Sequence, residues 1–242
     1  MNKVTPYLRL PFSFDVSRLK ADLAVVAGAD WLGHFNTGAY EKGWSCLALR
    51  SVNGSLDHIM PLEDARFADT PLLAQCPYFQ EVINGFECEK TSIRLMALEA
   101  GGVILEHRDS KASLEDGVTR LHIPVQTAPE VLFRIEGETV HFSAGHAWYL
   151  NASCLHGVEN RSSQARVHLM IDCVTNPWLE RVFQAAGGVL REASPYGDDA
   201  IHDGNVQEVI AALLSSGHHA GMLLAGQLRD THARRQAAGP RH

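Results

Sequence analysis

The sequence predicts a mainly β protein with flanking helices, built around an antiparallel barrel of the double-stranded β-helix type (jelly-roll, cupin-like). From Thr91 to Val174, short apolar stretches alternate with Gly and Asn turns at the spacing of an antiparallel sandwich or barrel. Before this region helical and strand patterns are mixed, and after it the pattern is helical. We therefore expect one barrel domain with N-terminal α/β elements over residues 1–180, its core at about 91–175, and a C-terminal helical extension over 181–242.

The N-terminal third combines helices with a strand. Residues 15–27 carry an apolar stripe at helical spacing and predict a helix, with Ser13 or Asp15 as its N-cap. Residues 44–52 predict a strand that ends in an Asn-Gly turn. Residues 78–84 predict a short helix stopped by a glycine.

The barrel region is predicted as strands and hairpins. The stretches SIRLMALE and VILEHRD flank Ala100-Gly101-Gly102 and are expected to form a hairpin. RLHIPVQT follows, then VLFRIEGETVHF as a second hairpin, GHAWYLN as a strand, and HGVENRSSQARVHLMIDCV as a third hairpin. After Pro177, WLERVFQAAG and NVQEVIAALLSSG predict helices, and the last twelve residues, THARRQAAGPRH, predict a frayed end.

Composition excludes several classes of protein. The chain is 45% hydrophobic and 20% charged, as in soluble globular proteins, and it has no apolar run near membrane-spanning length. A formal net charge of −7 argues against non-specific nucleic-acid binding. Five cysteines without C-x-x-C pairing, and no signal-peptide pattern, indicate reduced thiols in the cytoplasm. The C-terminal helices offer a surface for a homodimer.

The stretch ARVHLMIDCV has two contrasting faces. At the two-residue period of a strand, its aliphatic residues and Cys173 share one face, while Arg166, His168, Met170 and Asp172 share the other. The polar face meets water or lines a cavity that needs a fixed positive charge. An arginine directed into a closed barrel is costly unless an anion neutralises it, and its planar fork matches a carboxylate.

A set of potential metal ligands precedes this strand. His107 and Asp109 are two residues apart at the end of an apolar strand, so their side chains project to one side. His156, just before the turn into the last long strand, is the best placed third ligand. Two histidines and one carboxylate form the facial triad of non-haem Fe(II) oxygenases, which leaves open coordination positions. A hydrogen-bonded surface pair is the alternative interpretation of His107 and Asp109.

The order of these groups is more specific than any one of them. Arg166 follows His156 by ten residues. This ordered set, an H-x-D motif followed by a histidine and then by an arginine, resembles that of the 2-oxoglutarate-dependent oxygenases. RLHIPV repeats the arrangement of RVHLMI, with Arg120 and His122 two residues apart. Together EHRD, RLHIPV, WYLN–SCLHGVEN and RVHLMIDC resemble the aspartyl/asparaginyl β-hydroxylase family, in particular its bacterial branch, which includes L-proline cis-4-hydroxylases. The resemblance covers residues 91–180 well and the N-terminal part loosely.

The resemblance implies roles for individual residues. His107, Asp109 and His156 would be the ligands of Fe(II), and Arg166 would pair with the distal carboxylate of 2-oxoglutarate. Arg120 and His122 would contact either the cosubstrate or a substrate carboxylate. The reaction would consume O₂ and 2-oxoglutarate, release succinate and CO₂, and hydroxylate a substrate C–H.

Two features bear on the substrate. Animal protein hydroxylases of this family lack the acidic ligand that Asp109 supplies here, and this favours a small amino-acid substrate over a folded protein domain. Arg94 could bind a substrate carboxylate, or it could occupy a solvated position on its strand. The alternatives are hydroxylation of peptidyl or carrier-bound Asp or Asn, and a cupin-like module that binds a metal and an organic acid without turnover. His168 is either a neighbour that supports the site or a core residue.

Overall fold

The computed structural model describes residues 4–34, 36–40, 43–59, 65–109, 112–190, 196–198 and 200–238. These residues divide into two compact units, Met1–Leu190 and Arg191–His242. No helix in the described part of the chain is long and apolar enough to cross a lipid bilayer.

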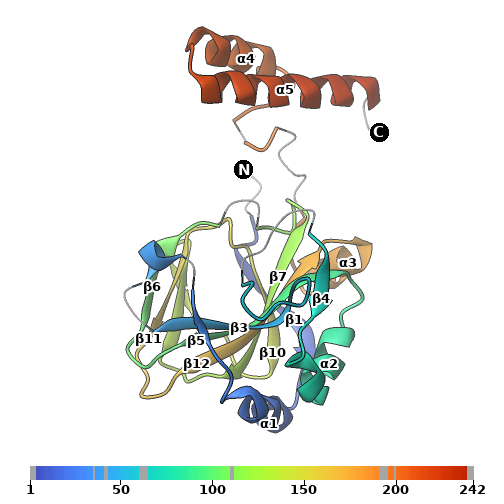
Figure 1. Cartoon of the computed structure of the whole chain (residues 1–242). Coiled ribbons are helices and arrows are strands. Elements are labelled where there is room, and N and C mark those ends of the chain that lie inside the picture. The colour runs from blue at the N-terminus through green and yellow to red at the C-terminus, as the bar shows by residue number, and fades with distance from the viewer. Residues whose placement is uncertain are drawn as a thin grey trace. The chain divides into compact units, whose positions relative to one another are not determined.

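Two antiparallel sheets form the first unit (Figure 1). The larger contains β1 (Tyr7–Ser13), β2 (Leu32–Gly33), β3 (Trp44–Val52), β4 (Phe67–Asp69), β5 (Lys90–Leu98), β7 (Val118–Gln126), β10 (His146–Leu150) and β12 (Arg166–Val174). Its order is β1-β10-β7-β12-β5-β3-β2, and β4 also pairs with β3. The smaller contains β6 (Val103–His107), β8 (Val131–Ile135), β9 (Glu138–Val140) and β11 (His156–Asn160), in the order β6-β11-β8-β9. This is the predicted double-stranded β-helix.

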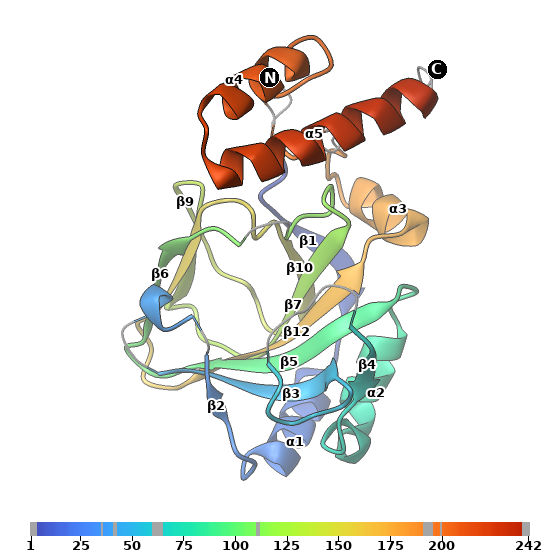
Figure 2. The same cartoon turned by 45° about the horizontal axis from the view of Figure 1, so that its top comes forward.

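Helices cover the outer face of the larger sheet. They are α1 (Val16–Val26), α2 (Pro77–Asn84) and α3 (Pro177–Ala185), with the short 3-10 turn η2 (Leu73–Gln75). A second 3-10 turn, η1 (Thr37–Ala39), packs instead into the core between the sheets. In Figure 2, α1 and α2 lie beyond β3 and β5, on the side away from β6 and β9. The aliphatic face of β12 packs into the core that these helices complete, whereas Met170, on its other face, joins the core between the sheets. The two-residue alternation of the sequence is therefore confirmed.

The predicted helices near the N-terminus are confirmed, together with their end signals. Asp15 is the N-cap of α1, and its carboxylate accepts the backbone N–H groups of Ser17 and Arg18 at 2.8 and 3.2 Å. Helix α2 begins at Pro77 and ends before Gly85. Pro77 is favourable there because the first helical position needs no N–H donor.

Two of the predicted hairpins are wrong. β5 pairs with β12 and β3, whereas β6 pairs with β11, so the Gly101-Gly102 turn carries the chain from one sheet to the other. β11 and β12 likewise belong to different sheets. The side-chain amide of Asn160 ties both crossings together by donating to the carbonyls of Leu98 and Gln164 at 3.0 and 2.8 Å. Tight turns look the same in sequence whether the strands pair or change sheets.

The remaining hairpin forms as predicted. β8 and β9 pair across Glu136 and Gly137, which have φ values of 47° and 81°. Two consecutive residues with positive φ are typical of the tight turns whose twist matches that of a hairpin.

The second unit contains α4 (Val206–Ser215) and α5 (His219–Ala238). Its own core comprises Tyr196, Val206, Ile210, Ala225 and Leu228. The prediction of a frayed end from Thr231 is wrong as far as Ala238, because α5 continues to that residue, and residues 239–242 lie outside the described part. The sequence of this last stretch has no apolar stripe, but Ala, Arg and Gln are strong helix formers.

Candidate metal centre and its pocket

Strand pairing brings the three predicted ligands together. His107 ends β6 and lies directly opposite His156, the first residue of β11, with ring centroids 4.4 Å apart. Asp109 follows β6, and its backbone N–H donates to the carbonyl of Ala152 at 2.8 Å. One ligand atom from each of the three side chains lies within 4.8 Å of the others, so the group could hold a single metal ion.

Backbone carbonyls orient both histidines for binding through Nε2. His107 Nδ1 lies 2.8 Å from the carbonyl of Leu105, and His156 Nδ1 lies 2.9 Å from that of Cys154. A proton on Nδ1 satisfies these carbonyls and leaves the Nε2 lone pair for a metal, the usual support for a ligating histidine. Burial lowers the pKa of His156 to about 4, so this imidazole is neutral, as a metal ligand must be.

The third ligand is held as a carboxylate. Burial alone would raise the pKa of Asp109, but the charge of Arg120 and its hydrogen bond outweigh this and leave the pKa below its ordinary value. Arg120 donates through Nη1 to Oδ2 of Asp109, while Oδ1 faces His107 Nε2 at 3.7 Å. One carboxylate oxygen is therefore engaged by an arginine and the other faces the histidines.

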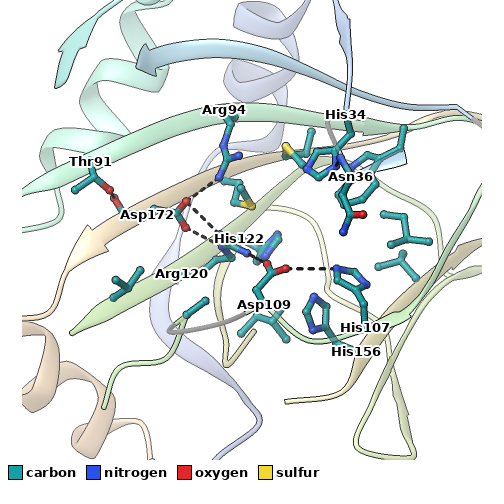
Figure 3. Close-up of a pocket in the computed structure, with 18 of the residues that line it drawn as sticks. His34, Asn36, Thr91, Arg94, His107, Asp109, Arg120, His122, His156 and Asp172 are labelled. Carbon is teal, nitrogen blue, oxygen red and sulfur yellow. Dashed lines mark hydrogen bonds and ion pairs between the residues drawn. The ribbon is translucent and has the colours of Figure 1, made fainter. Parts of the chain in front are cut away.

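These ligands open into a cavity of about 630 Å³, lined by both sheets. Figure 3 shows His107, Asp109 and His156 at one end and Arg94, Thr91 and Asp172 at the other, with Arg120 between them. A cavity of this volume is in the ordinary range for small-molecule sites. The barrel thus encloses space for small organic molecules next to the metal ligands.

Asp172 organises the positive charge of this cavity. Its Oδ1 accepts a hydrogen bond from Arg120 Nε at 2.7 Å, and its Oδ2 accepts one from Arg94 Nη2 at 2.7 Å. Arg94 also donates to the carbonyl of Ile59 at 2.8 Å. Both arginines therefore have carboxylate partners within the protein. Burial lowers the pKa of Arg94, whereas Asp172 and Asp109 raise that of Arg120 despite its burial.

Arg166 differs from these two arginines. It is only 3% exposed and lines the same cavity, yet none of the described carboxylates forms an ion pair with it. Its Nη1 lies 3.4 Å from the carbonyl oxygen of Met96, and its Nε has no hydrogen-bond partner among the described residues. Burial lowers its pKa to about 10, so it remains charged at neutral pH. Burial of such a cation is costly unless an anion neutralises it.

The structure brings together all seven residues for which the sequence predicts a role. His107, Asp109, His156, Arg94, Arg120, His122 and Arg166 all line the one cavity. Arg108, which lies between two of the ligands in the sequence, forms an ion pair with Glu136 at 2.9 Å. His168 is fully buried and its Nδ1 lies 3.4 Å from that of His122.

Two features of the cavity escaped the sequence analysis. Asp172 shares the polar face of ARVHLMIDCV, and that alternation was the signal for its role. His34 and Trp44 also line the cavity, with their rings stacked 3.4 Å apart. They come from the N-terminal part, where the sequence carries no recognisable pattern of site residues.

A double-stranded β-helix that gathers two imidazoles and a carboxylate at one point defines the class of cupin-like proteins with a facial-triad metal site. Within that class, the chain belongs to the aspartyl/asparaginyl β-hydroxylase family, whose model matches residues 16–176. The predicted resemblance is confirmed.

Three curated relatives fit the bacterial branch of the family. The chain is 29% identical over 162 residues to the L-proline cis-4-hydroxylase of Rhizobium meliloti (strain 1021), covering 66% of this chain and 57% of that protein. It is 28% identical over 147 residues to the L-isoleucine 3(1)-dioxygenase of Pantoea ananatis (strain AJ13355), covering 55% and 45%. It is 25% identical over 138 residues to L-proline cis-3-hydroxylase 1 of a Streptomyces species, covering 53% and 46%. The matches thus span about half the length of these relatives.

Proposed function

We propose that the protein is an Fe(II)- and 2-oxoglutarate-dependent dioxygenase that hydroxylates a C–H of a free amino acid or a small amino-acid derivative. The observation that carries this proposal is the pairing, in one cavity, of the His107–Asp109–His156 group with the buried cation Arg166. A metal site alone would fit many cupin-like proteins. A fixed positive charge without a carboxylate partner among the described residues adds a place for an organic acid.

The donor set fits iron. Imidazole nitrogens and one carboxylate suit Fe(II), and three protein ligands leave positions for other ligands. Both histidines are oriented through Nδ1, and Asp109 is kept ionised by Arg120. Iron bound there would supply the activation of O₂ that couples decarboxylation of 2-oxoglutarate, to succinate and CO₂, with hydroxylation of the substrate.

The chain's own residues bind and orient the organic partners. Arg166 offers a planar pair of N–H groups that can receive the distal carboxylate of 2-oxoglutarate in two-point geometry. Arg94 Nε has no hydrogen-bond partner among the described residues, and this supports a contact with a substrate carboxylate. All three nitrogens of Arg120 donate to Asp172 or Asp109, which supports a role in placing the metal-binding carboxylate.

The substrate class follows from the enclosed site and from the relatives. The cavity lies between the two sheets and has polar groups at both ends, which suits a small polar molecule. The curated relatives are named for L-proline and L-isoleucine. An amino acid with an aliphatic or cyclic side chain is therefore the first class to test.

The decisive experiment is a screen for succinate release. The protein is incubated with Fe(II), 2-oxoglutarate, O₂ and each free amino acid, and products are examined by mass spectrometry for the gain of one oxygen. We expect succinate to rise well above the substrate-free level with at least one amino acid. His156→Ala should abolish the signal, while His141→Ala, whose ring contacts the carbonyl of Val131, should retain it.

A second measurement tests cosubstrate binding without turnover. Anaerobic addition of Fe(II) and 2-oxoglutarate should produce the weak visible charge-transfer band of a chelated complex. Folded protein that shows no such band would refute the assignment of 2-oxoglutarate. A band without succinate release in any screen would instead favour a binding module.

A further inference from the structure

Two histidines meet at the back of the cavity, one on β7 and one on β12. His168 pairs across the sheet with Pro124, two residues beyond His122, so both imidazoles lie on the same face. Their Nδ1 atoms are 3.4 Å apart and their ring planes are inclined by 74°. His122 lines the cavity, whereas His168 is fully buried and does not. The sequence alone left the role of His168 open.

Both imidazoles are neutral, so each carries one N–H. Burial, followed by the nearby arginine charges, holds the pKa of His122 and that of His168 well below the ordinary value. A hydrogen bond between the two Nδ1 atoms requires a proton on one of them and a lone pair on the other. The ring that donates this hydrogen bond has its proton on Nδ1, so its Nε2 is unprotonated. The ring that accepts it carries its proton on Nε2.

The surroundings of His168 decide between these two arrangements. Its ring lies nearly parallel to those of Phe133 and Phe142, at 21° and 17°. An N–H at its Nε2 lies in the ring plane and so does not point at either aromatic face. That Nε2 has no hydrogen-bond partner among the described residues. Buried N–H groups without acceptors are rare, and only His122 lines the cavity, where a bound molecule can supply an acceptor for Nε2–H. The proton of His168 therefore belongs on Nδ1.

We propose that His168 is a positioning residue: its Nδ1–H holds His122 as the Nε2–H tautomer, and His122 then donates a hydrogen bond into the cavity to an anionic oxygen bound beside Arg166. The assignment of that oxygen to 2-oxoglutarate rests on the proposed function. His122 Nε2 is buried and has no partner among the described residues, so a ligand oxygen would satisfy it. The charges of Arg120 and Arg166 both act on this ring, which places it among groups that favour an anion.

The first test observes the tautomer directly. Long-range proton–nitrogen NMR correlations on the Zn(II)-loaded protein distinguish the two neutral forms of an imidazole, and loss of a signal in His122→Gln identifies His122. We expect the Nε2–H form of His122 in the wild type and a mixture of both forms in His168→Leu. His168→Asn should restore the single form, because its amide N–H can occupy the place of Nδ1–H.

The second test measures the consequence for binding. Calorimetric titration of the Zn(II)-loaded protein with 2-oxoglutarate should show affinity weakened roughly three- to tenfold in His168→Leu, as expected for loss of part of a charge-assisted hydrogen bond. His168→Asn should lie within about twofold of the wild type. His146→Asn is the matched control, because its ring contacts Ser143 and does not line the cavity. If the role of His168 were merely structural, His168→Asn would not restore both the single tautomer of His122 and the affinity for 2-oxoglutarate.

The outcomes separate this inference from the proposed function. An Nδ1–H form of His122 in the wild type overturns the inference, as does an unchanged tautomer and affinity in His168→Leu. If the wild type does not bind 2-oxoglutarate at all, the proposed cosubstrate is wrong, and the NMR result still decides whether His168 sets the tautomer of His122.

Discussion

Replacing Arg166 by methionine should stabilise the metal-free protein while it weakens 2-oxoglutarate binding. Methionine keeps much of the volume and removes the charge. Burial lowers the pKa of Arg166 well below its ordinary value, to about 10. A tenfold change in acidity corresponds to about 1.4 kcal/mol, so burial of this charge costs about 3 kcal/mol. The long contact with Met96 and the position of the guanidinium over the Phe133 ring, at 5.6 Å, offset part of that cost. We expect a net gain of about 1–3 kcal/mol in the free energy of unfolding.

The same substitution should reduce affinity strongly. Truncating one partner of a buried charge pair costs about 2–5 kcal/mol, so the dissociation constant for 2-oxoglutarate should rise about 30-fold or more. Iron affinity should change little, because Arg166 makes no described contact with the three ligands. Urea unfolding of the metal-free protein gives the stability. Calorimetric titration of the Zn(II)-loaded protein with 2-oxoglutarate gives one affinity, and anaerobic titration of the metal-free protein with Fe(II) gives the other.

A matched variant controls for the loss of a positive charge. Arg134→Met removes an arginine whose side chain is 42% exposed and forms a surface pair with Glu159. It should change stability by less than about 1 kcal/mol and leave 2-oxoglutarate binding unaffected. The reasoning is refuted if Arg166→Met destabilises the metal-free protein as a core truncation would, or if it binds 2-oxoglutarate as tightly as Arg134→Met does.

Three further predictions concern the charges around the cavity. Asp172→Ala should destabilise the protein by about 3–5 kcal/mol in urea unfolding, because it leaves two buried arginines without this carboxylate partner. Asp69→Ala, the control, removes one partner of an exposed ion pair with Arg50 and should cost less than about 1 kcal/mol. Similar losses of stability in the two variants would contradict this prediction. The free energy of unfolding of the metal-free protein should fall as the pH drops below 6.5, because the unfolded chain protonates His122 and His168 in this range and the folded chain does not. The loss should reach up to about 1.4 kcal/mol per pH unit for each of these two histidines. Unfolding curves that coincide from neutral pH to about pH 5 would rule out this pH dependence. Zn(II) at a hundred times its dissociation constant should raise the free energy of unfolding by about 2.7 kcal/mol. If a thermal scan of His107→Ala still shows this stabilisation by Zn(II), the metal binds elsewhere.

Local patterns in the sequence were sufficient to predict a set of residues that line one cavity. The two-residue alternation of ARVHLMIDCV separated the face that packs under the helices from the face that lines the cavity, and the structure has the same division. The H-x-D spacing likewise predicted that His107, the last residue of β6, and Asp109, just after that strand, project to one side. Such patterns survive folding because the direction of a side chain in a strand depends only on its own backbone.

Strand partners and charge pairs were decided by the tertiary structure alone. The Gly101-Gly102 turn could close a hairpin or carry the chain to the other sheet, and only the pairing of β6 with β11 chose between them. That same pairing brought His156 opposite His107. Asp172 engages Arg94 and Arg120 from two neighbouring strands, which leaves Arg166 as a buried cation without a carboxylate partner among the described residues. The sequence thus determined which groups share a face. Which of those groups neutralise one another depends on contacts between segments far apart along the chain, and no local pattern encodes these.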